Sequence, residues 1–88
     1  MGVMMNKRKL DLGDRNIIGA RVTEARRESG LLQKDLLAKL QVEGVDISLP
    51  ALSLLEGQKR PVFDFELKAL AKILNKEPNW FFEWGENE

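Results

Sequence analysis

The chain contains no cysteine, histidine or tyrosine among its 88 residues. Without cysteine it can form neither disulfides nor thiolate metal sites, and without histidine it lacks the commonest metal ligand and general base. No pair of acidic residues lies within an apolar run, where burial would tune a catalytic carboxyl. We therefore expect no enzyme activity, no metal site and no cofactor.

The sequence also lacks a long apolar segment. No run approaches the roughly 20 residues that a membrane span needs, and the N-terminal stretch MGVMMNKRKLDLGD lacks the apolar core of a signal peptide. A myristoylation motif fails because Asn6 stands where serine or threonine is required. These absences predict a cytoplasmic protein with no membrane partner.

The sequence also has no excess of basic or acidic residues, since 14 basic residues balance 14 acidic ones. Zero net charge argues weakly against nucleic acid as a partner. The charges are unevenly distributed, however: residues 1–30 carry +3, residues 31–62 are neutral and residues 63–88 carry −3. A basic face is therefore possible despite the neutral total.

The length and composition predict one small globular domain. With 43% hydrophobic and 32% charged residues, 88 residues suffice for a single core and leave no room for a second, ligand-sensing domain. We expect a flexible arm at residues 1–14, which is either a solvated tail or a basic arm reaching along a duplex, a folded domain at residues 15–84 and an acidic tail at residues 85–88. No small-molecule ligand is evident.

Apolar residues three or four apart indicate helices throughout the folded part. The pattern predicts helices at residues 16–29, 33–41, 49–56 and 64–74, and a short fifth helix from Pro78. No segment has the alternation of a strand. The sequence therefore predicts an all-α, five-helix orthogonal bundle around one core.

Residues that favour helix ends accompany these segments. Asn16 or Asp14, Ser48 and Asp64 are predicted N-caps, and Gly30 is a predicted C-terminal left-handed residue. Leu32 stands where a polar cap is expected, so the helix from residue 33 is predicted to be poorly capped unless another group supplies the acceptor.

Four blocks, GARVTEAR, LLQKDLLAKL, ISLPALSLLEGQKRP and FELKALAKILNKEPNWFF, carry a resemblance that covers residues 17–82. In order and spacing they resemble the Cro/repressor type of helix-turn-helix transcriptional regulator, the xenobiotic-response-element (XRE) class. The resemblance implies a lambda-repressor-like domain, double-stranded DNA as partner, a homodimer, and repression by occupying an operator. The helix from Leu49 to Glu56 would enter the major groove.

The same resemblance implies roles for individual residues. Gln33 would lie against the phosphate backbone, and an ion pair between Arg26 and Glu56 would tie the first helix to the third. The candidate DNA-binding residues are Arg21, Gln33, Lys34, Ser48, Leu49, Pro50, Ser53, Leu54, Lys59 and Arg60.

The chain also departs from the family pattern. The outward positions of the third helix are mainly apolar, and only Ser53 can form a side-chain hydrogen bond there. Either DNA is bound with modest specificity, through its backbone, its shape and thymine methyl groups, or this face contacts protein and DNA binding is weakened or lost. The alternative prediction is thus a protein-interaction module. The left-handed residue after this helix is expected at Gly57 or, with strain, at Gln58.

Six aromatic residues lie after residue 62, more than one small core requires. Phe82 and Trp84 cannot both point inward with Phe81 from one helical turn. The aromatic residues at this end either complete the core or, as the resemblance to similar repressors implies, form an apolar dimer contact through Phe82 and Trp84.

Overall fold

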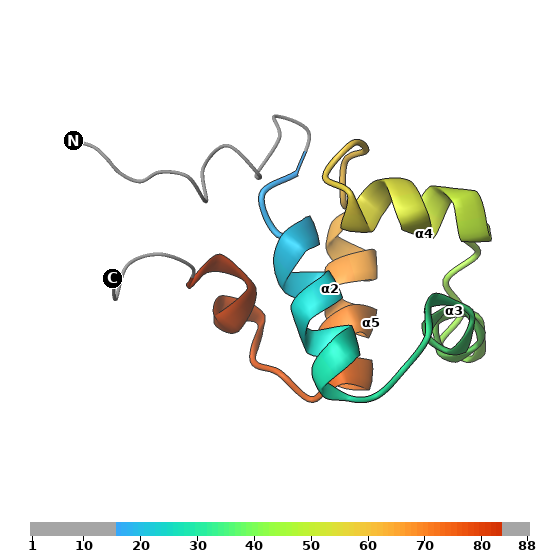
Figure 1. The fold of residues 1–88 in the computed structure, drawn as a ribbon, viewed down its shortest axis with the longest axis horizontal. Helices are drawn as coiled ribbons and strands as arrows, with labels where there is room; N and C mark the ends of the chain where they lie inside the picture. Colours follow the sequence, from blue (N-terminus) through green and yellow to red (C-terminus); the bar gives the residue numbers. More distant parts are fainter. Residues whose placement is uncertain (1–15, 84–88) are drawn as a thin grey trace.

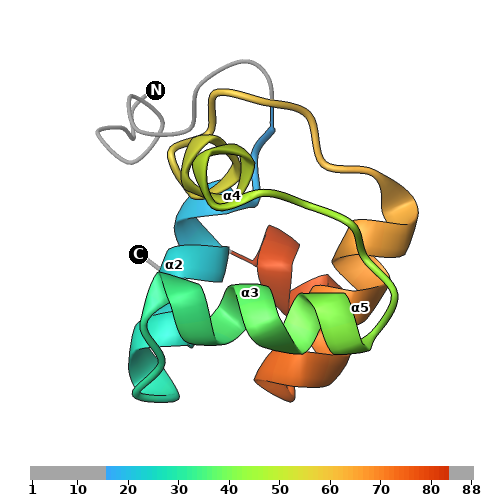
Figure 2. The ribbon, with the colours of Figure 1, turned by 90° about the vertical axis from the view of Figure 1, so that its right-hand side faces the viewer.

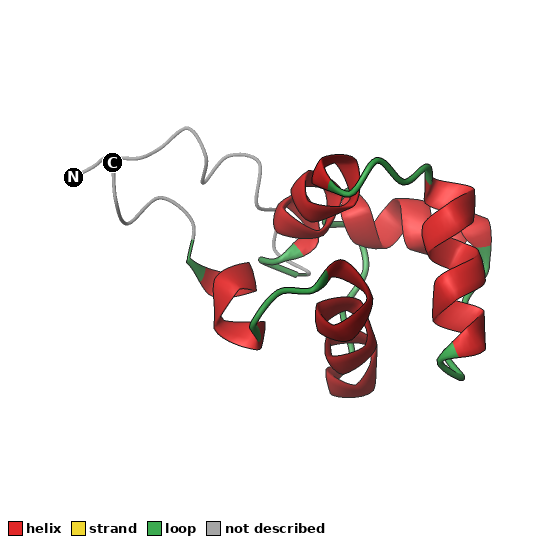
Figure 3. Ribbon diagram, turned by 90° about the horizontal axis from the view of Figure 1, so that it is seen from below, coloured by secondary structure: helices red, strands yellow, loops and turns green. Residues whose placement is uncertain are grey.

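The computed structural model describes residues 16–83, which form four α-helices followed by one 3-10 segment. The elements are α2 (Gly19–Glu28), α3 (Gln33–Val42), α4 (Leu49–Glu56), α5 (Asp64–Leu74) and η1 (Pro78–Phe82). This part of the chain contains no strand (Figure 3). The predicted arm at residues 1–14, the tail at residues 85–88, Asp14 and Trp84 lie outside the described residues.

The helices cross one another rather than forming a parallel stack. In Figure 1, α2 and α5 run through the middle, η1 lies on one side and α3 and α4 lie on the other. α4 is seen lengthwise where α3 is seen end-on, and Figure 2 shows the reverse. Helix α4 contacts both α2 and α3, whereas α5 contacts α2, α3 and η1. The α3–α4 pair therefore forms one side of the molecule.

One apolar core joins all five elements. Its side chains come from the predicted helical faces, and the largest of them are completely enclosed. Burying side chains of this size stabilises the fold by about 1.5–3 kcal/mol each. The largest fully buried side chains are Val22, Leu36, Leu40, Leu52, Leu55, Leu70 and Phe81.

Helix α2 begins at Gly19, three residues later than the predicted start at residue 16. The difference arises because Asn16 acts ahead of the helix: its Oδ1 accepts hydrogen bonds from the N–H groups of Ile18 and Gly19. Its Nδ2 donates to the carbonyl oxygens of Leu55 and Arg60, at 3.0 and 2.8 Å. One buried amide thus caps α2 and also holds the chain that leaves α4.

Gly19 lies where α2 passes directly over the end of α4. A Cβ atom at this position would overlap the carbonyl oxygen of Leu55 and press on the side chain of Gln58. Only glycine therefore allows the two backbones to approach this closely.

Helix α3 starts at Gln33 as predicted and ends at Val42, one residue later than predicted. Leu32 offers no side-chain cap, but the Asp35 carboxylate accepts a hydrogen bond from its N–H at 2.9 Å. Residues 43–48 then connect α3 to α4, with Val45 and Ile47 both buried in the core. The link between α3 and α4 is therefore held in place by its own buried side chains.

Helix α4 has the predicted bounds, and Ser48 Oγ accepts a hydrogen bond from the N–H of Ala51, as expected of a cap. After the helix, Gln58 and not Gly57 adopts the left-handed conformation, with φ of 64°. A non-glycine residue in this region costs roughly 1 kcal/mol. Gln58 is buried, and its Nε2 has no hydrogen-bond partner among the described residues.

The predicted cap of α5 is wrong. Asp64 is the first helical residue and Phe63 precedes it, while the Glu66 carboxylate accepts a hydrogen bond from the Phe63 N–H. The Glu66 carboxylate, in the first turn of the helix, therefore completes the cap. The fifth helix is a 3-10 segment rather than an α-helix.

No helix in residues 16–83 has the length and apolar character needed to cross a lipid bilayer.

Candidate nucleic-acid interface

Helix α4 has one side buried against the core and one side exposed to solvent. Leu52 and Leu55 are fully buried against the core, whereas Leu49 and Leu54 are 42% and 48% exposed. Ser48, Pro50 and Ser53 are exposed as well. Five candidate interface residues are therefore exposed on this helix and its cap. The exposed leucines do not contribute to the monomer's core.

The buried side of α4 carries one charged group, Glu56, paired with Arg26 of α2. The Arg26 guanidinium donates to both carboxylate oxygens, Nε to Oε2 at 2.8 Å and Nη2 to Oε1 at 3.0 Å. Its Nη1 donates to the carbonyl oxygen of Leu31 in the α2–α3 turn. The two residues paired in the sequence analysis therefore join three helices, because this turn leads directly into α3.

Gln33 and Ser53 continue this network to the surface. Gln33 Nε2 donates to Glu56 Oε1 at 3.0 Å, and Ser53 Oγ donates to Gln33 Oε1 at 3.3 Å. Thr23 Oγ lies 3.2 Å from the same carboxylate oxygen. The start of α3 and the outer face of α4 are thus held in a fixed relation.

Arg21 is not part of this group. Its guanidinium donates two hydrogen bonds to the carbonyl oxygen of Trp80 and one to Glu24, and it lies 3.6 Å above the Trp80 ring. Lys76 lies over the same ring at 4.4 Å. Arg21 therefore fastens η1 to α2, and its donors are not directed to the α3–α4 surface.

The basic candidates differ in how free they are. Lys34 and Lys59 are exposed, at the start of α3 and after α4 respectively. Arg60 is partly buried and donates two hydrogen bonds to the Glu66 carboxylate. Lys34 and Lys59 can therefore meet an anion without breaking an ion pair, whereas Arg60 would have to leave one.

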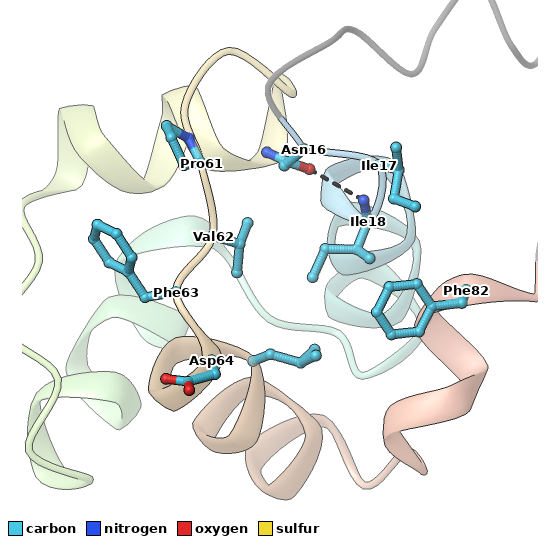
Figure 4. Close-up of a pocket in the computed structure, with 9 residues that line it drawn as sticks. Asn16, Ile17, Ile18, Pro61, Val62, Phe63, Asp64 and Phe82 are labelled. Atoms are coloured by element: carbon cyan, nitrogen blue, oxygen red, sulfur yellow. Dashed lines mark hydrogen bonds between the residues drawn. The ribbon is translucent and has the colours of Figure 1, made fainter.

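A second surface feature is an apolar groove of about 380 Å³ between the start of α2, the α4–α5 loop and η1 (Figure 4). Phe63 and Phe82 are each about half exposed on it. The predicted dimer residue Phe82 therefore lies on a free apolar surface. The described chain begins and ends near this groove, at Asn16 and just after Phe82. Its lining comprises Asn16, Ile17, Ile18, Pro61, Val62, Phe63, Asp64, Leu67 and Phe82.

The sequence patterns did not predict the roles of Thr23 and Glu66, and they predicted only part of the role of Asn16. Thr23 joins the Glu56 network, and its position three residues before Arg26 is the signal that places both on one helical face. Glu66 binds Arg60 and caps α5, and its position three residues after Phe63 is the corresponding capping signal. Asn16 was predicted as a cap, but its bonds to Leu55 and Arg60 have no local signal. In residues 16–83, no cluster of three or more acidic side chains could hold a metal ion.

Comparisons with protein-family models, with curated proteins and with solved structures give no significant match for this chain.

Proposed function

We propose that this protein is a DNA-binding transcriptional regulator of the lambda-repressor-like, orthogonal helix-bundle type. α3 and α4 are its helix-turn-helix, and α4 enters the major groove. It acts in the cytoplasm as a homodimer, without catalysis or cofactor, and represses by occupying an operator. The observation that carries the proposal is the exposed outer side of α4, which is supported from behind by the network from Arg26 to Ser53.

The placement of polar and basic groups around α4 supports this proposal. Gln33 lies at the N-terminus of α3, where helix dipoles and free amides favour anions such as phosphate. Lys34 follows Gln33 in α3, and Lys59 lies three residues after the end of α4. Such residues provide affinity and salt dependence without reading sequence. Arg21 is left out of the proposed contacts because it binds η1.

A second candidate function is a protein-interaction module on the same fold. Leu49 and Leu54 favour it, since two half-exposed leucines on one short helix are typical of a protein-docking face. The exposed lysines at the start of α3 and after α4, together with the N-terminus of α3, favour DNA.

A duplex titration separates these functions. A labelled random-sequence duplex is titrated with the protein at about 50 mM and then about 200 mM salt, and the dissociation constants are compared. A DNA-binding protein should bind at low salt and weaken steeply at high salt, because phosphate contacts release counterions. Absence of binding at the lower salt concentration would reject the regulator and favour the protein-interaction module.

A further inference from the structure

A chain of hydrogen bonds runs from Glu56 through Gln33 to Ser53, and the donor and acceptor of each bond are fixed. They begin at the Glu56 carboxylate, which has acceptors only and already faces the Arg26 guanidinium. Whatever side-chain amide atom approaches this carboxylate must therefore be a donor. The atom that does so is Gln33 Nε2, at 3.0 Å from Oε1.

This contact determines which way the Gln33 amide points. A rotated amide would place two oxygen atoms opposite each other, so the nitrogen stays on the Glu56 side and Oε1 faces Ser53. Ser53 Oγ lies 3.3 Å from that oxygen and donates its only hydroxyl proton to it. The exposed hydroxyl of Ser53 therefore has lone pairs, and no proton, left for a ligand.

On the basis of the proposed function, we infer that Ser53 determines specificity by accepting a hydrogen bond from an exocyclic amino group in the major groove. Adenine N6 and cytosine N4 are the donors displayed there. Leu49 lies one turn before Ser53 on the same side of α4, and its side chain suits the thymine methyl group rather than a G·C pair. The preferred target is therefore an A·T pair.

Alternating duplexes test this inference without a known operator. Three labelled duplexes of equal length are compared: adenine–thymine, 2-aminopurine–thymine and adenine–uracil. 2-Aminopurine still pairs with thymine but removes the major-groove amino group, and uracil removes the methyl group. In an alternating duplex every register offers an adenine, so the position of the bound protein does not matter.

The natural protein should bind the adenine–thymine duplex roughly threefold to tenfold more tightly than the 2-aminopurine duplex, the range expected for one hydrogen bond. Loss of the methyl group should weaken binding roughly threefold. Ser53→Ala should bind the adenine and 2-aminopurine duplexes equally. Gln33→Met frees the hydroxyl proton of Ser53, so the preference between these two duplexes should shrink even where overall affinity falls. Ser29→Ala, an exposed serine at the end of α2, is the matched control and should keep the natural ratio.

The outcomes distinguish this inference from the proposed function. Salt-dependent binding with equal affinity for the adenine and 2-aminopurine duplexes would overturn the role of Ser53 and leave the DNA-binding function standing. An unchanged preference in Ser53→Ala would also overturn it. No binding to any of the three duplexes at low salt would overturn the proposed function, and the inference with it. The comparison of duplexes with the natural protein needs no variant to fold.

Discussion

Arg26 joins three helices through its side chain. Its guanidinium binds Glu56 and the carbonyl oxygen of Leu31, and the side chains of both ion-pair partners are at least 90% buried. Removing one partner of such a pair leaves a buried charge without compensation, which costs more than the pair itself contributes. The ion pair therefore matters chiefly because it fixes the relative positions of α2, α3 and α4.

Arg26→Ala should lower the free energy of unfolding by about 3 kcal/mol or more, because it leaves the Glu56 carboxylate buried and unpaired. Urea denaturation followed by circular dichroism measures this change. Arg27→Ala is the matched control, since Arg27 is exposed on the same helix, and it should change stability by less than about 0.5 kcal/mol. Equal losses in the two variants would show that the ion pair does not join the helices.

The sequence predicted those features that depend on contacts between residues close together in the chain. Ser48 could be recognised as a cap because its hydroxyl acts within one turn, and the apolar spacing gave α4 its bounds. The start of α2 was predicted three residues too early because Asn16 also bonds the chain after α4, a contact between distant segments. Arg21 was assigned to DNA on family resemblance, whereas the position of Trp80 beside it depends on the whole fold. Such contacts between distant segments cannot be predicted from the local sequence.

At the level of the elements, α4 is short and depends on its neighbours. An isolated helix of eight residues is not stable in water, so α4 keeps its shape through packing on α2 and α3. The close approach at Gly19 and the Gln33–Ser53 contact are two different parts of this support. Substitutions at Gly19 should lower stability, whereas substitutions on the exposed surface around α4 should affect binding alone.

Gly19→Ala should destabilise the fold by about 2–3 kcal/mol, because the added methyl group must push α2 away from the backbone of α4. Thermal and urea denaturation measure the loss. Gly30→Ala is the control for glycine replacement: a Cβ at Gly30 meets nothing within 4 Å, but the residue has φ of +73°. Its cost should therefore be the conformational one of about 1 kcal/mol. A smaller loss for Gly19→Ala than for Gly30→Ala would contradict the close contact between the helices.

Lys34→Ala and Lys59→Ala should each reduce the slope of log affinity against log salt by about 1, because each removes one phosphate contact. Fluorescence titration with a random duplex at several salt concentrations gives the slope. Lys68→Ala, an exposed lysine on α5, should leave it unchanged. A slope that responds equally to all three substitutions would mean that DNA is not bound by the α3–α4 surface.

Replacing Leu49 with Gln and Leu54 with Arg tests the outer side of α4 directly. If this side contacts DNA, the polar variant should gain affinity or change its preferred sequence, because it acquires groups that can bind base edges. If it contacts protein, the variant should lose its partner, because the apolar surface is gone. Selection of bound fragments from a random duplex pool, carried out with both proteins, compares their preferences. Identical selected sequences and identical affinities would speak against a base-contacting role for these positions.

For the whole molecule, the α3–α4 surface and the apolar groove serve different proposed purposes. The groove carries half-exposed aromatic side chains and no free basic residue among those that line it. If it forms the contact between two copies, Phe82→Glu should weaken the dimer by placing charges in the interface. Sedimentation at several protein concentrations measures the association. Glu83→Gln, the neighbouring exposed position, should leave it unchanged, and a monomeric natural protein at all concentrations would refute the dimer.

If this protein is the proposed regulator, the contact at Gly19 limits how its activity can be controlled. Because α2 and α4 touch through their backbones, α4 cannot change its orientation without moving α2. A regulator of this kind would be inactivated by competition for its DNA-binding surface or by dissociation of the proposed dimer. If the proposed function is correct, the concentration of the protein, rather than a change in its shape, would control how much of the DNA is bound.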